Sequence, residues 1–272
     1  MIAVTGATGN VGRELVRILA EAGETVTALS RGEAGELPGG VRHVRADLAD
    51  PDALRPALDG VDALFLLVAG DDPQGVLDAA KAGGVRRVVL VSSIGVATRP
   101  DVYRHPAAFE AALLGSGLEQ TVLRCGGLDS NALAWAGSIR ADRVAAAPFG
   151  DVGLPVVDPA DVAEVAAAAL LRPGHTGSVY ELTGPAPTTP RQRAAAIAEA
   201  LGEPVRFVEQ TRQEAREQML AFMPEPVVEG TLAILGEPLP AERRVSPDVE
   251  RVLGRAPRPF ADWAARSAAA FR

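Results

Sequence analysis

The sequence contains few of the side chains that disulfides and most metal sites require. Its single cysteine, Cys125, excludes a disulfide framework and a cysteine-based metal centre. The three histidines, His43, His105 and His175, stand far apart and share no close-spaced ligand motif, so no metal site is expected. No G-x-S-x-G segment occurs, which excludes the nucleophile elbow of an α/β-hydrolase.

Positive charge and long apolar runs are also scarce. The formal net charge of -8 argues against a nucleic-acid partner, because neutralising phosphates requires a basic surface. No apolar run approaches the length of a membrane span, and the first strand-like run begins at the second residue, so neither a membrane segment nor a signal peptide is expected. The length of 272 residues suits one large domain or one and a half, and we expect a soluble cytoplasmic protein.

A glycine-spaced segment opens the chain. A β-prone run, residues 2–5, is followed by Gly6, Gly9 and Gly12 at three-residue spacing, and a helical pattern begins at Val11. In a dinucleotide site the first glycine permits the turn, the second lets the backbone approach pyrophosphate, and the third lets the helix pack on the strand. The helix N-terminus adds unpaired N–H groups and partial positive charge. The alternative is an ordinary tight turn between a strand and a helix.

The end of the second predicted strand, residues 25–29, bears on the choice of dinucleotide. Ser30-Arg31-Gly32 follows it, and no carboxylate occurs before Glu33. An acidic residue here would hold the ribose hydroxyls of NAD, whereas an arginine suits a 2′-phosphate, so NADPH is favoured over NADH. Arg31 could instead be a solvated loop residue, and Arg13 is a second candidate for the same phosphate.

A third predicted strand, residues 41–45, is followed by Asp47 and Leu48. Asp47 could accept a hydrogen bond from the adenine amino group while Leu48 packs on the ring. The alternative is a turn former before the next helix, although Asp50 and Pro51 already form a cap and first-turn pair there.

Four further strands complete a predicted parallel sheet. They are residues 62–68, 87–91, 121–124 and 178–183. Helical segments alternate with the strands, which implies right-handed crossovers, and ligands bind such sheets at the carboxyl ends of the strands. The predicted cofactor-binding residues are Gly6, Thr8, Gly9, Asn10, Val11, Gly12, Arg31, Asp47, Leu48, Val68, Ala69, Ser92 and Gly126.

The C-terminal part changes character after residue 184. It contains amphipathic helical segments joined by proline-rich links, and we expect no second sheet there. Residues 131–145 also have a helical pattern. The predicted organisation is a dinucleotide-binding domain of residues 1–126 plus 156–184, with a substrate-binding cap of residues 127–155 plus 185–272.

Several segments along the whole chain resemble the NmrA-like group of atypical short-chain dehydrogenase/reductases. They are residues 5–12 (TGATGNVG), 46–48 (ADL), 91–93 (VSS), 110–118 (E-x-x-L-x-x-S-G-L), 121–124 (TVLR), 158–163 (DPADVA), 180–185 (YELTGP) and 257–263 (PRPF-x-x-W). The resemblance implies an α/β fold: a doubly wound parallel Rossmann sheet, a smaller and mainly helical C-terminal cap, and NAD(P) binding. It does not imply one reaction, because relatives include quinone reductases, enzymes of secondary metabolism and regulators that only sense the dinucleotide.

The sequence departs from the wider superfamily at the catalytic pair. Ordinary members use Tyr-x-x-x-Lys, but Ala107 stands four residues after Tyr103, and the only lysine, Lys81, lies on an earlier predicted helix. Many NmrA-like proteins keep a lysine or histidine four residues before the glutamate of E-x-x-L, where this chain has Pro106. His105 is displaced from that position by one residue.

Tyr103 and His105 are therefore the candidate proton donors. Each has a plain alternative, Tyr103 as a packed loop aromatic and His105 as a cap at a helix start. Glu110 is interpreted as a structural or helix-surface residue, and Cys125 as a small core residue rather than a nucleophile.

Three functions remain open from the sequence. The favoured one is an NADPH-dependent oxidoreductase that transfers hydride to a small apolar acceptor, a quinone or a polyketide-like aromatic or carbonyl compound. The alternatives are a non-catalytic NAD(P)-sensing regulator and a non-redox enzyme, a cyclase or isomerase, on the same fold. The acceptor pocket is expected to be lined by residues 67–70, 94–105 and 126–135. Both a monomer and a homodimer are compatible with the sequence.

Overall fold

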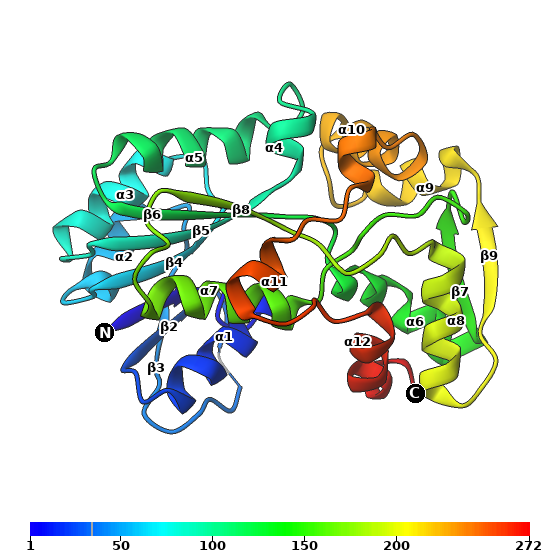
Figure 1. Ribbon diagram of the computed structural model, residues 1–272, viewed down its shortest axis with the longest axis horizontal. Helices are drawn as coiled ribbons and strands as arrows, with labels where there is room; N and C mark the ends of the chain where they lie inside the picture. The colour runs from blue at the N-terminus through cyan, green and yellow to red at the C-terminus, as the bar shows by residue number, and fades with distance from the viewer. Residues whose placement is uncertain (34) are drawn as a thin grey trace.

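The computed structural model describes residues 1–33 and 35–272, and its largest element is a seven-stranded parallel sheet (Figure 1). The strand order is β3-β2-β1-β4-β5-β6-β8, with every neighbouring pair parallel. The central strands are apolar and buried on both faces, because helices cover both sides of the sheet. The strands are β1 (Ile2–Thr5), β2 (Val26–Ser30), β3 (Arg42–Arg45), β4 (Ala63–Leu67), β5 (Arg87–Ser93), β6 (Glu119–Cys125) and β8 (Ser178–Leu182).

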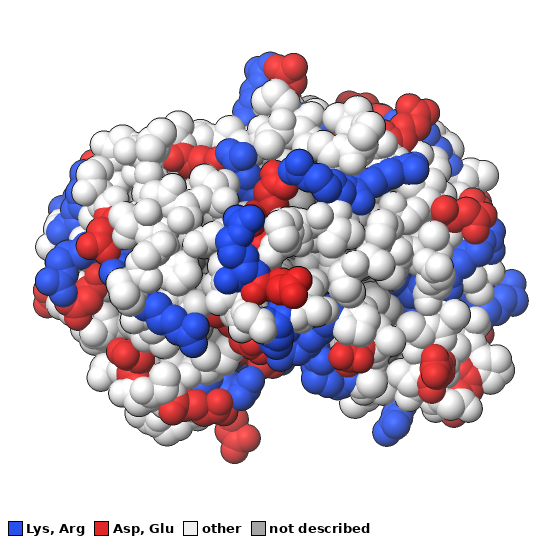
Figure 2. Space-filling model, viewed as in Figure 1, with Lys and Arg blue, Asp and Glu red and all other residues white. Residues whose placement is uncertain are grey.

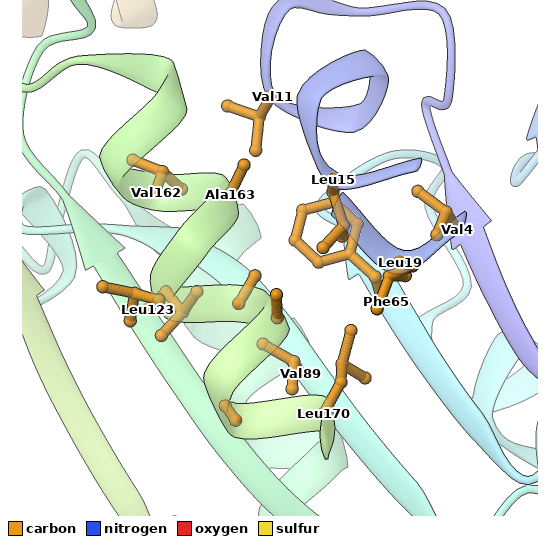
Figure 3. Packing of buried hydrophobic residues seen from close by; sticks show 14 of the residues in the cluster. Val4, Val11, Leu15, Leu19, Phe65, Val89, Leu123, Val162, Ala163 and Leu170 are labelled. Atoms are coloured by element: carbon orange, nitrogen blue, oxygen red, sulfur yellow. The ribbon is translucent and has the colours of Figure 1, made fainter. Parts of the chain in front are cut away.

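Helices on the two faces of this sheet enclose two separate apolar clusters. One face carries α1 (Asn10–Glu21) and the alanine-rich α7 (Pro159–Leu171), which pack on each other and on the sheet (Figure 3). The other face carries α2 (Pro51–Leu58), α3 (Pro73–Ala82) and α5 (Arg104–Gly115), and a short α4 (Gly95–Thr98) precedes α5. This arrangement is the doubly wound Rossmann architecture predicted from the sequence.

Side-chain caps begin α2 and α7, and the sequence predicts the first of them at Asp50. Asp50 Oδ1 accepts a hydrogen bond of 3.2 Å from Ala53 N at the start of α2. Asp158 Oδ1 accepts one of 2.9 Å from Ala160 N at the start of α7. Each cap satisfies a backbone donor that has no partner within the helix, so these helix starts are encoded locally.

The remaining elements form a smaller assembly beside the sheet (Figure 1). Its middle part is η1 (Asp129–Trp135), α6 (Ala136–Asp142) and β7 (Val144–Pro148). Its later part is α8 (Pro190–Leu201), β9 (Arg206–Gln210), α9 (Arg212–Leu220), α10 (Glu225–Gly236), η2 (Pro240–Arg243), α12 (Phe260–Ser267) and η3 (Ala268–Phe271). Aromatic side chains of α12 and η3, including Trp263 and Phe271, pack with α6 and α8 in a third apolar cluster.

Two expectations about this assembly are wrong. Strands β7 and β9 pair in parallel, from Val144 with Arg206 to Pro148 with Gln210, so a small second sheet exists. The helix predicted over residues 131–145 ends at Asp142, because Arg143 adopts a left-handed conformation with φ 53° and the chain then enters β7. The alanine run of β7 has high helix propensity, and pairing with a strand about 60 residues away overrides it.

Helix α11 (Asp248–Leu253) packs on elements of the main sheet, unlike the helices before and after it in the C-terminal segment. It lies against α7 and β8, and Val249 belongs to the apolar cluster under α1. The chain therefore returns to the main sheet between η2 and α12. The proposed division of the chain into two domains remains a prediction. That division assigns α11 to the cap, whereas the contacts of α11 would assign it to the domain that contains the main sheet.

Candidate cofactor and acceptor site

The glycine turn after β1 has the close packing that a dinucleotide cradle requires. Gly6 has φ 60°, and a Cβ atom there would collide with the side chain of Leu67. A Cβ at Gly12 would collide with the carbonyl oxygen of Gly6, so the helix can approach the turn only because Gly12 has no side chain. Gly9 stands at the N-cap of α1 without a side-chain cap. The first N–H groups of α1 are thus left for an anionic ligand, and the cradle fits a pyrophosphate.

Thr5 fastens this turn to the neighbouring strand. Its buried Oγ1 donates to Phe65 O at 3.0 Å and accepts from Leu67 N at 2.9 Å. The hydroxyl thereby joins the carboxyl ends of β1 and β4, and Leu67 lies against the glycine turn. We did not predict this role, although a threonine at the end of an apolar strand is a visible signal.

Both arginines considered for the 2′-phosphate lie at this end of the sheet. Ala7 N donates to Leu29 O at 3.0 Å, which holds the turn against β2 two residues before the exposed Arg31. Arg13 folds back over the turn, and its Nη2 donates to Thr8 O at 3.0 Å. Arg13 already has a structural partner, so the assignment of Arg31 to a 2′-phosphate remains the better-founded prediction.

Asp47 has a turn-forming contact. Its exposed carboxylate accepts a hydrogen bond of 3.0 Å from Ala49 N through Oδ1. The loop of Leu48 lies against the loop after β4, since a Cβ atom at Gly70 would stand 2.6 Å from Leu48 O. These contacts agree with the turn-former alternative, and the roles of Asp47 and Leu48 toward adenine stay predictions.

A cavity of about 430 Å³ opens at the carboxyl ends of β4 and β5. It is lined by Leu67, Val68, Val91, Ser92, Ser93, Val102, Tyr103, His105, Pro106 and Val227. Two of the three segments predicted to line the acceptor pocket contribute to it. Residues 126–135 do not, because η1 packs into the third apolar cluster and Val227 of α10 provides the facing wall instead. Of the predicted cofactor residues, Val68 and Ser92 belong to this lining, and the others, including Ala69 and Gly126, do not.

Tyr103 and His105 enter the cavity from the start of α5. Tyr103 is the N-cap residue, and burial raises the pKa of its hydroxyl while a hydrogen bond with the Ser93 side chain opposes that increase. His105 lies inside the first turn, with Nε2 2.7 Å from Gly70 O, so this nitrogen carries the hydrogen and donates it. The structure places both candidate donors in one pocket, and their catalytic roles stay predictions.

Behind the cavity wall, Glu110 joins three elements. Ser92 Oγ donates to Glu110 Oε1 at 2.5 Å, and Arg124 Nη2 donates to Glu110 Oε2 at 2.6 Å. The carboxylate is largely buried, so Glu110 has the structural role rather than that of a helix-surface residue. Because Ser92 gives its proton to Glu110, its oxygen can face the cavity only as an acceptor.

Cys125 lies in the core, as predicted. Burial raises the pKa of its thiol to about 12, so the reactive thiolate is not formed near neutral pH. No group of histidine, cysteine, aspartate or glutamate in residues 1–33 and 35–272 is placed to hold a metal ion. Within the same residues, no helix is long and apolar enough to cross a membrane.

Asp129 is a buried polar residue that we did not predict as important. Its side chain is 0% exposed, and neither carboxylate oxygen has a hydrogen-bond partner among the described residues. Burial, and next the charge of Asp158, raise its pKa to about 7, while Arg193 and Arg266 oppose the increase. The signal in the sequence was an aspartate two residues after the glycine pair that follows β6.

The surface shown in Figure 2 has basic and acidic side chains interspersed. A second cavity, of about 450 Å³, lies along β8 and α11, and its charges are paired within the chain. Arg244 pairs with Glu181 at 2.7 Å and Arg251 with Asp248 at 2.8 Å. On this face, charges of opposite sign therefore compensate one another.

The parallel sheet, the glycine cradle and the cavity beside it define a dinucleotide-binding protein of the Rossmann class. Comparison with family models agrees, since residues 6–173 match the NAD(P)H-binding family. The chain belongs to this family, within its NmrA-like, atypical short-chain dehydrogenase/reductase group.

Characterised relatives cover the chain from end to end. It is 40% identical to the (4-alkanoyl-5-oxo-2,5-dihydrofuran-3-yl)methyl phosphate reductase of Streptomyces griseus, covering 100% of this chain and 99% of the relative. It is 35% identical to the NAD(P)H azoreductase of Xenophilus azovorans, with the same coverage. Among solved structures, the NADPH complex of an Escherichia coli quinone oxidoreductase superposes with a TM-score of 0.78 at 26% identity, covering 98% of this chain and 99% of that one.

Proposed function

We propose that the protein is an NADPH-dependent reductase that transfers hydride to a small, electron-poor acceptor. The observation that carries this proposal is the apolar cavity beside the glycine cradle, whose lining contains only two ionisable side chains, Tyr103 and His105. A protein that only senses the dinucleotide has no need of such a cavity. The relatives named as reductases support the same choice over a regulator or a non-redox enzyme.

The bound NADPH would supply the hydride, and the chain would supply position and a proton. The glycine cradle and the N-terminus of α1 would hold the pyrophosphate, and Arg31 the 2′-phosphate. The cavity would hold the acceptor against Val68 and Ser92 at the strand ends. After hydride reaches the acceptor, a proton from Tyr103, His105 or water completes the two-electron reduction.

The absence of a Tyr-x-x-x-Lys pair restricts the acceptor. A conjugated bond that is already polarised accepts hydride without strong protonation, whereas an isolated ketone needs a good acid. The names of the relatives point to an unsaturated oxo-dihydrofuran, an azo compound and a quinone, which all contain an electron-poor conjugated bond. We therefore propose quinones and doubly activated alkenes, including unsaturated lactones, as the substrate class.

The test is NADPH oxidation by the purified protein with a panel of quinones, azo dyes and acyl-substituted unsaturated lactones. We expect turnover with members of this panel, slower turnover with NADH, and none with simple aliphatic ketones. Calorimetric titration with NADPH and NADH runs in parallel. Tight NADPH binding without turnover of any acceptor would favour the regulator, and binding of neither dinucleotide would overturn the proposal.

A further inference from the structure

A buried ion pair joins the segment before Tyr103 to the C-terminal assembly. Arg99, at the end of α4, pairs with Glu242 of η2 with an N–O distance of 2.7 Å. The side chains are only 18% and 4% exposed, unlike the many surface ion pairs of this protein. A pair this buried carries a desolvation penalty, so it is better explained by placement of the groups around it than by net stability.

Both ends of the pair continue into backbone hydrogen bonds. The carbonyl oxygen of Arg99 accepts from Val102 N at 3.0 Å and from Tyr103 N at 3.1 Å. Its Nη2 donates to Glu237 O at 3.1 Å, at the C-terminal end of α10. Glu242 Oε2 also accepts from Leu239 N at 2.8 Å. One ion pair thus reaches the start of α5 on one side and the end of α10 on the other.

These are the two elements that face each other across the acceptor cavity. Tyr103 and Val102 line it from one side, and Val227 of α10 from the other. Val102 packs directly on α10, since a Cβ atom at Gly230 would collide with its Cγ1. The Arg99–Glu242 pair and the packing of Val102 on Gly230 therefore both join the two walls of the cavity.

The pair also acts electrostatically on the tyrosine. The charge of Arg99 lowers the pKa of Tyr103, and the charge of Glu242 raises it, alongside the larger effect of burial. The only lysine, Lys81, donates to Ser116 O elsewhere, and the positive charge that acts on the Tyr103 hydroxyl is that of Arg99. Its charge is largely compensated by Glu242 in this conformation.

We propose that Arg99 and Glu242 are positioning residues for the acceptor site: the pair holds Tyr103 and α10 as facing walls and keeps the compensated charge of Arg99 near Tyr103, whose backbone N–H donates to Arg99 O. This inference rests on the proposed function for its consequence in turnover. The effect of the Arg99–Glu242 pair on Tyr103 can be tested without any substrate.

The substrate-free test follows the ionisation of Tyr103 by fluorine NMR of protein labelled with fluorotyrosine. The chain has two tyrosines, and Tyr180→Phe assigns the two signals. Glu242→Gln removes the compensating charge and leaves Arg99 positive, so we expect the pKa of Tyr103 to fall by about one unit, at the lower end of the range for a charge close to a titrating group. An unchanged or increased pKa would overturn the inference.

A matched control comes from the same helix as Val227. Glu229 of α10 also pairs with arginines, Arg212 at 2.5 Å and Arg216 at 2.7 Å, but on the surface of the assembly. Glu229→Gln removes one negative charge in the same way and should leave the Tyr103 titration unchanged. An equal shift in both variants would mean that the effect is general and that Arg99 and Glu242 have no special role.

A second variant covers the case in which Glu242→Gln does not fold. The double substitution Arg99→Met with Glu242→Met removes both charges together, so the Tyr103 titration should stay near that of the parent while the cavity walls lose their connection. We then expect a several-fold rise in the acceptor KM with a smaller change in kcat, and an unchanged KM would contradict the positioning role. If no acceptor turns over in the parent protein, the proposed function fails, while the titration of the Glu242→Gln protein still decides this inference.

Discussion

At the scale of single residues, we predict that Arg31 selects the dinucleotide and that Asp129 makes the stability of the protein depend on pH. Arg31 is exposed at the end of β2, where it can meet a phosphate on the ribose. The Asp129 carboxylate is buried and has no hydrogen-bond partner among the described residues, so ionising it carries a desolvation penalty.

For Arg31 we expect Arg31→Asp to weaken NADPH binding by roughly tenfold or more while NADH binding changes little, because one hydrogen bond to a charged group is worth about 1.5–3 kcal/mol. Calorimetric titration with each dinucleotide measures both affinities. Arg55→Asp, at another exposed arginine, is the control and should change neither affinity. Equal losses for NADPH and NADH in Arg31→Asp would remove Arg31 from the 2′-phosphate site.

For Asp129 we expect stability to depend on pH. Its pKa rises from 3.8 to about 7 in the folded protein, so the folded state binds more protons between these values. The free energy of unfolding should therefore fall as pH rises from about 4 to about 7, and stay level above that. Asp129→Asn removes this slope and should gain up to about 4 kcal/mol over the parent near neutral pH. Denaturant unfolding at a series of pH values measures it, and parallel profiles for the two proteins would contradict the expectation.

At the scale of elements, the cofactor cradle depends on how closely α1 approaches the end of β1. That approach is limited by the contact between Gly12 and the carbonyl oxygen of Gly6. The strand, turn and helix were all predicted, because their pattern lies within a dozen consecutive residues. Strands β7 and β9 were not predicted, because each becomes a strand only by pairing with the other.

Gly12→Ala should lower both stability and NADPH affinity. The added methyl group meets backbone rather than a mobile side chain, so α1 must shift, at a cost of about 1–3 kcal/mol. Gly137→Ala in α6 is the control, since no atom lies within 4 Å of its added methyl group and the helix should gain up to about 1 kcal/mol. Thermal unfolding and calorimetry on both variants make the comparison. Unchanged dinucleotide binding in Gly12→Ala would show that the cradle tolerates displacement of α1.

At the scale of the whole molecule, buried charges fasten the C-terminal segment to the main sheet. Asp161 of α7 is 0% exposed and accepts from Arg258 N and from Arg255 Nη2, each at 2.7 Å. Arg258 also pairs with it through its side chain. These contacts join residues more than 90 positions apart in the sequence. Arg255 and Arg258 lie between α11 and α12, so the contacts hold this link against α7.

Asp161→Ala should destabilise the protein by about 3–5 kcal/mol, because two arginines lose a buried partner and a backbone N–H loses its acceptor. Asp52→Ala is the control, as that carboxylate is 87% exposed and pairs with Arg55 on the surface of α2. It should cost less than about 1 kcal/mol. Urea unfolding compares the two. A loss in Asp161→Ala no larger than in Asp52→Ala would mean that the C-terminal segment is held by its apolar contacts alone.

The sequence by itself determined the parallel sheet, the glycine cradle, the helix caps and the family, because each depends on residues a few positions apart or on a period of two or 3.6 residues. It also placed the candidate proton donors Tyr103 and His105 after the carboxyl end of β5, and their catalytic roles stay predictions. Only the tertiary structure decided that Val227 faces them, that Glu242 compensates Arg99, and that Asp129 is buried. The physical reason is separation along the chain: Arg99 and Glu242 are 143 residues apart, and their contact leaves no local pattern in composition or spacing.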